Sequence, residues 1–273
     1  MRGRGAGGLG PRTLALGSAA GLLLLYLPLL AVAALSLNSA RVGLRWEGLS
    51  LVWYQRLFAD EAVRAAAWNT LLLALASTAL ATPLGTLLAL GLERTPWSRR
   101  AAHALDVLGD LPVVTPDIVF AAVLVIAFNA LRQLSSAFAP GLFVMVLGHV
   151  TFQVAFVSLV VRARLALIGQ DLAEAANDLY ADRWFQLRHV TLPLLLPGVV
   201  VGALLAFTLS LDDFVISFFT AGPRSATLPI HIYASLRRGL SPELHALSTL
   251  IVLVTLLLVS GLGLSSPRTG SSS

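Results

Sequence analysis

Three aspartates stand in surroundings where an acidic residue is costly. Asp117 directly precedes the charge-free run 118–131, and Asp212 and Asp213 are neighbours inside the apolar run 198–219. A carboxylate at the centre of a membrane span costs at least about 2.5 kcal/mol, so acidic residues there often mark an ion or substrate pathway. The chemistry these side chains could perform is transient binding of a cation. The alternatives are that they are neutralised structural groups, or that the spans end before them at the membrane surface.

Neighbouring polar residues extend this candidate pathway. Adjacent residues on a helix point about 100° apart, so Asp212 and Asp213 would not share one narrow face. We expect one of them to line a pathway and the other to pair with a neighbouring helix or a polar backbone group. Ser210 is assigned to the same pathway by its position. His149, in the apolar run 141–161, is expected to serve packing or a structural hydrogen bond.

Aromatic side chains could supply further cation-binding surfaces. Trp53 and Tyr54 lie in the mixed-charge segment 38–66, and Tyr26 lies in the first apolar run. An aromatic face attracts a cation that lies within about 6 Å of the ring centre. The alternative is membrane anchoring, because Trp and Tyr are also enriched at membrane–water interfaces.

Composition excludes several classes of protein. The chain of 273 residues is 57% hydrophobic and only 12% charged, about half the charge of a soluble domain, which indicates an integral membrane protein. All 19 basic residues are arginine, and the net charge of +5 is spread over loops, which argues against nucleic-acid binding. Cysteine is absent from the sequence, and no metal-binding or nucleophile motif occurs in it. We therefore predict no catalytic residue, no metal site and no cofactor bound by this chain.

Six apolar runs predict an all-α integral membrane fold with six transmembrane helices, each supplying the roughly 20 residues of one crossing. The runs occupy residues 14–37, 65–92, 105–131, 141–161, 198–219 and 246–264. The first run is too long for the core of a signal peptide and is expected to be retained. Arginines without any acid in the tail 1–13 predict cytoplasmic N- and C-termini. The membrane domain is then 14–264, between a flexible tail, 1–13, and a disordered cytoplasmic tail, 265–273.

Prolines are expected to shape the third of these crossings. The run 118–131 is too short to cross a bilayer alone, so the third crossing is expected to extend back through Pro116 and Pro112 toward Leu105. Tyr26 and Pro28 interrupt the first of the six runs.

A polar segment, 171–197, separates the fourth and fifth apolar runs. Asp171 can cap a helix, and Glu174 three residues later completes a capping-box-like pair. Helical spacing then places three residues on one apolar face: Leu172, Ala176 and Leu179. On composition alone, an ordinary loop at the membrane surface fits equally well.

A second short helix is expected after Asp182, carrying Trp184, Leu187 and Val190. Pro193 and Pro197 are expected to stop this helix and to start the fifth run. The whole segment is therefore predicted to be helix, turn, helix outside the bilayer. A further short helix is expected at 228–236, on the outer surface.

The pattern Glu174-Ala175-Ala176, followed by Leu192-Pro193, resembles the EAA loop of ABC importer permeases. In that family the loop is a coupling helix that docks into a groove on the cytoplasmic ATPase. The resemblance implies a coupling loop at 171–193 in which these residues take part: Glu174, Ala175, Ala176, Leu179, Tyr180 and Pro193. The family usually has glycine where this chain has Tyr180, and a bulky residue adopts a left-handed turn only with roughly 1 kcal/mol of strain.

Stretches along nearly the whole chain resemble the second permease subunit of spermidine/putrescine ABC transporters. The runs most specific to that branch are S-L-D-D-F from Ser210 and R-G-L-S-P-E-L-H from Arg238. The resemblance implies the type I ABC importer permease fold and inward transport of polyamines across the bacterial inner membrane. It also implies partners: ABC ATPase subunits that bind ATP and Mg, a second homologous permease, and an extracytoplasmic substrate-binding protein.

Two alternative functions stay open on the sequence. The first is an ABC importer permease for another small organic cation or an amino-acid derivative, such as an opine. The second is an ion-coupled secondary carrier that uses the Asp212–Asp213 pair as its ion site and works without an ATPase. A membrane-bound enzyme is disfavoured, because the sequence contains no nucleophile motif or metal-ligand cluster.

Overall fold

A computed structural model describes residues 11–40, 45–168, 182–239 and 241–265 of the chain. The regular elements in these ranges are helices, and the strand-like pairing is confined to one isolated bridge, between Asn38 and Leu49. The chain divides into two compact units, Met1–Glu61 with Ile232–Ser273, and Ala62–His231. The all-helical class predicted from the apolar runs is confirmed.

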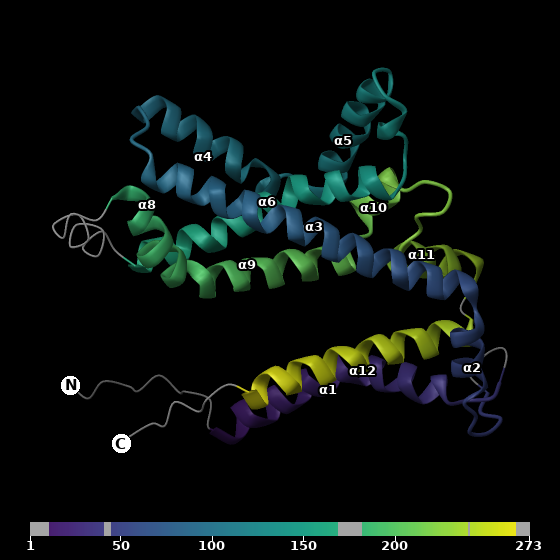
Figure 1. The fold of residues 1–273 in the computed structure, drawn as a ribbon. Helices are drawn as coiled ribbons and strands as arrows, with labels where there is room; N and C mark the ends of the chain where they lie inside the picture. The colour runs from purple at the N-terminus through teal and green to yellow at the C-terminus, as the bar shows by residue number, and fades with distance from the viewer. Residues whose placement is uncertain (1–10, 41–44, 169–181, 240, 266–273) are drawn as a thin grey trace, which may run out of the picture. The chain divides into compact units, whose positions relative to one another are not determined.

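Three long helices form the centre of the second unit. They are α3 (Glu61–Arg94), α6 (Leu142–Ile168) and α9 (Leu192–Asp212) (Figure 1). They meet at small residues: a Cβ added to Gly85 of α3 would lie 2.7 Å from the Cβ of Val157 on α6. An added Cβ at Gly198 of α9 would lie 2.7 Å from the Cβ of Arg164 on α6. The absence of a side chain at both glycines therefore permits the close approach of these helices, as in other membrane bundles.

The region predicted to be one crossing, 105–131, is two helices. Helix α4 (Arg99–Val114) ends before Thr115, and helix α5 (Asp117–Arg132) starts after Pro116, with an angle of 110° between them. The residue before a proline is disfavoured in the helical conformation, and Thr115 is extended, with φ −78° and ψ 130°. The expectation of one continuous crossing was therefore wrong. Pro112, in contrast, is accommodated inside α4.

Other helices also continue through prolines. Helix α1 (Pro11–Ser36) continues through Pro28. Helix α8 (Arg183–Gln186) passes through a π-helical turn, η2 (Leu187–Thr191), directly into α9. Pro193 and Pro197 both lie inside this continuous helical stretch, so the expected stop at these two prolines was wrong. The π-helical turn directly precedes Pro193, where the ordinary helical hydrogen-bond pattern is already altered.

The start of this helical stretch agrees with the prediction. Asp182 accepts a hydrogen bond from the backbone N–H of Phe185, at 2.6 Å from its Oδ1. This is the contact expected of a helix-capping aspartate, so the predicted start after Asp182 is confirmed.

In the first unit, α1 packs along α12 (Pro242–Ser265), and α2 (Val52–Ala59) also packs against α12 (Figure 1). An ion pair with a 3.9 Å separation joins Arg56 of α2 to Glu243 of α12.

Helix α11 (Leu228–Arg238) occurs where a short helix was predicted. The short helix α10 (Val215–Thr220) completes the described elements that position the site.

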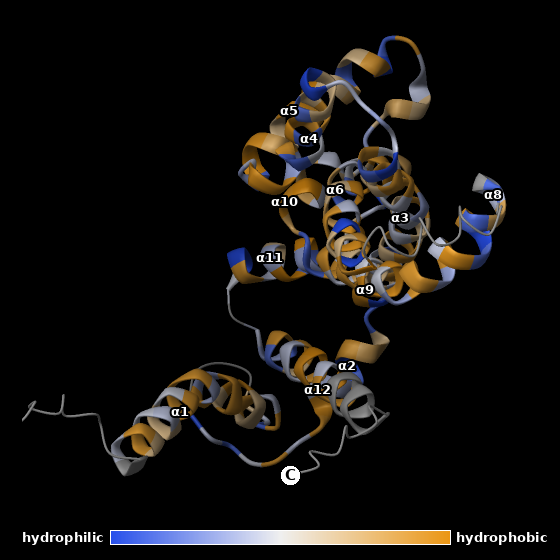
Figure 2. Cartoon of the chain, turned by 90° about the vertical axis from the view of Figure 1, so that its left-hand side faces the viewer, coloured by the Kyte–Doolittle hydropathy of each residue, from blue (hydrophilic) through white to orange (hydrophobic). Residues whose placement is uncertain are grey.

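Many large apolar side chains are exposed on several helices, such as Leu24 of α1 at 77% and Leu87 of α3 at 63%. Figure 2 colours much of these helices orange, for hydrophobic residues. By length and composition, the described residues contain four helices able to cross a membrane, or five if α4 and α5 together count as one crossing. Residues 242–257 of α12 form a shorter apolar helix. These features are those of an integral membrane protein.

Candidate cation pocket

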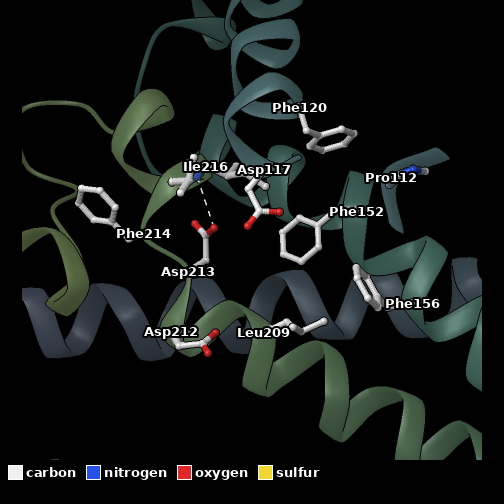
Figure 3. Close-up of a pocket in the computed structure, with 11 residues that line it drawn as sticks. Pro112, Asp117, Phe120, Phe152, Phe156, Leu209, Asp212, Asp213, Phe214 and Ile216 are labelled. Carbon is white, nitrogen blue, oxygen red and sulfur yellow. Dashed lines mark hydrogen bonds between the residues drawn. The ribbon is translucent and has the colours of Figure 1, made fainter. Parts of the chain in front are cut away.

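The three aspartates singled out in the sequence line one pocket of the second unit. The pocket has a volume of about 340 Å³, and Asp117, Asp212 and Asp213 all contribute to its wall (Figure 3). Asp117 is the first residue of α5, Asp212 is the last residue of α9, and Asp213 lies in the link to α10. The pocket therefore lies where the ends of three helices meet.

The helix break after Asp212 changes the predicted relation between the two adjacent acids. Asp213 is extended, with φ −62° and ψ 122°, so the two residues are not successive positions of one helix. The Asp213 carboxylate accepts hydrogen bonds from the backbone N–H groups of Ile216, at 3.3 Å, and Ser217, at 2.8 Å. Its side chain thus satisfies the first turn of α10, which explains why the chain leaves α9 at this point. The expected continuous helix across 198–219 was wrong, because it is interrupted at Asp213 and Phe214 and continues as the separate helix α10.

The three carboxylates differ in accessibility. Asp117 and Asp212 are exposed, whereas the side chain of Asp213 is only 11% exposed. In Figure 3 the Asp213 side chain points toward the first turn of α10, and the Asp212 side chain points away from that turn. Among the described residues, Asp117 and Asp212 have no ion-pair partner, so both carboxylates are available to a ligand.

Phenylalanines supply much of the remaining wall, and sequence reasoning missed them. They are Phe120, Phe152, Phe156 and Phe214. Phe152 and Phe156 are four residues apart on α6 and meet edge to face, with ring centres 6.3 Å apart. That spacing predicts that the two rings share one helix face. The sequence does not mark them as site residues, however, because a phenylalanine resembles its apolar neighbours in such a run. Acidic groups beside aromatic faces are suited to binding an organic cation.

Ser210, predicted to belong to the pathway, is buried beside the pocket instead of lining it. Its Oγ lies 2.8 Å from Nδ1 of His149 and 3.3 Å from Oγ of Ser77. His149 itself is fully buried and hydrogen-bonded, as expected. Gln153, also fully buried, donates to Ser77 Oγ at 3.1 Å and to the carbonyl of Ala206 at 2.9 Å. These side chains connect α3, α6 and α9 behind the pocket.

The three aromatic candidates lie in the other unit. Trp53 is 2% exposed, and its indole N–H donates to the carbonyl of Asn38 at 2.7 Å. The Tyr54 hydroxyl shares a 2.7 Å hydrogen bond with Ser36, and Tyr26 is 49% exposed on α1. Arg56 lies over the Trp53 ring, 4.9 Å from its centre. A role for these rings in the substrate pathway stays a prediction.

The predicted coupling residues fall mostly outside the described ranges. Glu174, Ala175, Ala176, Leu179 and Tyr180 belong to the segment 169–181, which the structure does not describe. Pro193 is described and lies in the first turn of α9. Among the described residues, no cluster of histidine and acidic side chains could hold a metal ion.

Comparison with known proteins identifies the family of the chain. Residues 81–266 match the sequence model of the family described as "Binding-protein-dependent transport system inner membrane component". The chain belongs to this family. Its homologues are permease subunits, which is consistent with a transport role for the chain itself.

Two relatives illustrate the similarity to family members. The chain is 36% identical over 235 residues to the spermidine/putrescine transport system permease protein PotC of Haemophilus influenzae, covering 86% of this chain and 89% of PotC. It is 37% identical over 234 residues to the putrescine transport system permease protein PotI of Escherichia coli K12, covering 85% and 83% of the two chains.

A solved structure supports the fold. A chain of a bacterial ABC transporter involved in the import of the acidic polysaccharide alginate superposes with a TM-score of 0.73 at 20% identity. The superposition covers 95% of this chain and 96% of the other. The chain therefore shares its fold with that chain of the alginate transporter.

Proposed function

We propose that this chain is a transmembrane permease subunit of an ATP-driven ABC importer that moves polyamines, spermidine or putrescine, inward across the bacterial inner membrane. One observation carries the proposal. Three aspartates from three separate elements line a single pocket with phenylalanine walls, in a chain over one-third identical to permeases named for these substrates. Asp117 and Asp212 would meet the ammonium groups, and Asp213 would supply a third, more buried charge.

The chemistry of the pocket suits a linear polycation. Polyamines carry two or more positive charges separated by methylene segments, and the pocket wall contains both carboxylates and aromatic rings. A cation over an exposed aromatic ring gains about 0.5–1 kcal/mol, and each exposed carboxylate adds a modest attraction. Several weak contacts favour brief occupancy, which a transport pathway requires because it must also release its cargo.

We infer a six-span topology with both termini in the cytoplasm. The four long apolar helices supply four crossings, the bent pair α4–α5 supplies one, and α12 supplies the sixth. The permease domain then comprises 14–264, with tails at 1–13 and 265–273.

The energy source is proposed to be ATP hydrolysis on separate ABC ATPase subunits, which bind ATP and Mg. The coupling loop 171–193 would dock onto an ATPase through Glu174, Ala175, Ala176 and Leu179. A second homologous permease would complete the pathway, and an extracytoplasmic binding protein would deliver the substrate. The family description, binding-protein-dependent transport, supports the last of these partners.

The test is uptake of labelled putrescine and spermidine into proteoliposomes that contain the complete transporter. This chain, its partner permease and the ATPase are reconstituted with the binding protein, with and without internal ATP. We expect ATP-dependent uptake that falls at least tenfold in Asp117→Asn, Asp212→Asn and Asp213→Asn. Asp110→Asn is the matched control, because Asp110 is an exposed aspartate of the same unit outside the pocket wall.

The possible outcomes separate the candidate functions. Binding-protein-stimulated ATP hydrolysis without polyamine uptake would retain the importer and reject the substrate, in favour of another organic cation or an amino-acid derivative. Uptake that needs an ion gradient and ignores ATP would reject the importer in favour of a secondary carrier.

A further inference from the structure

A buried histidine contacts the acidic pocket from the core side. His149 lies on α6, three residues before the pocket-lining Phe152, and its side chain is fully buried. Its Nε2 is 3.3 Å from Oδ2 of Asp213 and 3.1 Å from Oγ of Ser217. Its Nδ1 is 2.8 Å from Oγ of Ser210. Both ring nitrogens are thus engaged, and one of them reaches a carboxylate of the candidate pathway.

The hydrogen-bond partners determine which nitrogen donates. An ionised carboxylate can only accept, so the proton on Nε2 of His149 faces Asp213 and Ser217. In the neutral ring, Nδ1 then accepts from the hydroxyl of Ser210, which can both donate and accept. The Ser210 oxygen is free to accept from Ser77, 3.3 Å away. One tautomer of His149 therefore satisfies every contact, and it directs its donor toward the pocket carboxylate.

Asp213 is constrained far more than the other two acids of the pocket. Two backbone N–H groups of α10 and the His149 ring hold its oxygens. We propose that His149 is a positioning residue that holds the Asp213 carboxylate in place at the pocket wall and thereby strengthens binding of the cationic substrate. This inference rests on the proposed function, and it assigns to His149 a role distinct from filling the helix core.

The physical reason is preorganisation. A carboxylate that rotates freely loses orientational freedom when a cation binds, and this cost weakens binding. A carboxylate already held by fixed donors has lost that freedom during folding. In metal sites, removing a partner that hydrogen-bonds a ligating side chain lowers affinity or activity by about 10- to 100-fold, and we expect an effect at the lower end of that range for this carboxylate. Ser210 contributes indirectly, because its hydroxyl fixes the His149 ring.

The experiment uses the complete transporter in proteoliposomes and four variants of this chain. His149→Phe removes both ring nitrogens but keeps an aromatic ring, whereas His149→Gln keeps an N–H donor near the Nε2 position. Uptake of labelled spermidine at limiting concentration is expected to fall about tenfold in His149→Phe and to recover to within about threefold of the parent in His149→Gln. In an Asp213→Asn background, His149→Phe is expected to cause little further loss, because its effect passes through Asp213.

Gln153→Leu is the matched control for the general loss of a buried hydrogen bond. Gln153 lies on the same helix, is equally buried and bonds to α3 and α9 without contacting Asp213. The fold-losses of uptake caused by Gln153→Leu and by Asp213→Asn are expected to multiply in the double variant. If His149→Phe also multiplies with Asp213→Asn, or transports like the parent, the positioning role is wrong.

A second measurement decides the question independently of transport. The carboxylate stretching band of Asp213, assigned in infrared difference spectra by its disappearance in Asp213→Asn, is expected to shift in His149→Phe and to return in His149→Gln. An unshifted band would overturn the inference even if polyamines are transported. Failure of the parent transporter to take up polyamines, with the band shift present, would instead reject the proposed substrate alone.

Discussion

At the scale of single residues, ion pairing separates structural charges from charges available to a ligand. Arg162 of α6 pairs with Glu93 at 2.7 Å and with Asp106 at 3.0 Å. It thereby links the end of α3 to α4. Asp117 and Asp212, in contrast, have no ion-pair partner among the described residues. The acids that hold helices together are thus distinct from the two exposed acids of the pocket.

This contrast predicts a measurable role for Arg162. Arg162→Met should lower the stability of the purified transporter in detergent by about 1 kcal/mol, because partly exposed ion pairs are screened by solvent. Polyamine affinity should be unchanged. Thermal unfolding at low and high salt is the measurement, with the smaller difference from the parent at high salt. Arg99→Met, on the exposed start of α4, is the control, and an equal loss in both variants would contradict the structural role of Arg162.

The acids of the site could be found from the sequence, and their surroundings could not. Asp117, Asp212 and Asp213 stand out because a charge interrupts an apolar run. The phenylalanine walls carry no such contrast. The burial of Ser210 and the capping role of Asp213 depend on contacts with α6 and α10, which local pattern does not contain. His149 was expected to make a structural hydrogen bond, but its particular partner came only from the packing of α6 against α10.

At the scale of helices, the ends of elements decide where the chemistry lies. Asp117 starts α5, Asp212 ends α9 and Asp213 caps α10. Helix existence was predictable from apolar runs of sufficient length. Helix continuity was not: α1 continues through Pro28, and the stretch from α8 to α9 continues through Pro193 directly after a π-turn, whereas Pro116 marks a sharp break. Helix propensity alone does not predict which of these three prolines ends a helix.

Close packing of α3 against α6 predicts opposite effects for two glycines of one helix. Gly85→Ala places a Cβ 2.7 Å from Val157 and should destabilise the protein by about 1–3 kcal/mol. Gly91→Ala, where nothing lies within 4 Å of the added Cβ, should be neutral or stabilising by up to about 1 kcal/mol. Midpoints of thermal unfolding in detergent give the comparison. Equal midpoints would show that α3 and α6 do not approach this closely.

At the scale of the whole molecule, the proposed topology can be read out directly because the sequence contains no cysteine. A single cysteine at Thr95, between α3 and α4, is expected on the cytoplasmic side. A single cysteine at Ser136, between α5 and α6, is expected outside. An impermeant maleimide added to intact cells, with the outer membrane made permeable, should label Ser136→Cys and spare Thr95→Cys until the inner membrane is opened.

The reverse labelling pattern would invert the assigned orientation. Labelling of both positions from outside would show that α4 and α5 do not form one crossing. Both side chains are exposed within the described ranges, so a missing signal would reflect sidedness instead of burial. Expression of each variant is checked by maleimide labelling after detergent solubilisation.

Asp213 both caps a helix and lines the pocket, and this combination has a consequence for how related permeases diverge. Its carboxylate closes the first turn of α10 and also forms part of the pocket wall. Under the proposed function, a substitution there would alter both the folding of α10 and the recognition of the substrate in a single step. Asp117 and Asp212 make no comparable capping contact among the described residues. Natural variation in cargo among relatives is therefore expected to accumulate at those two positions, while an aspartate persists at 213 even in permeases that carry uncharged molecules.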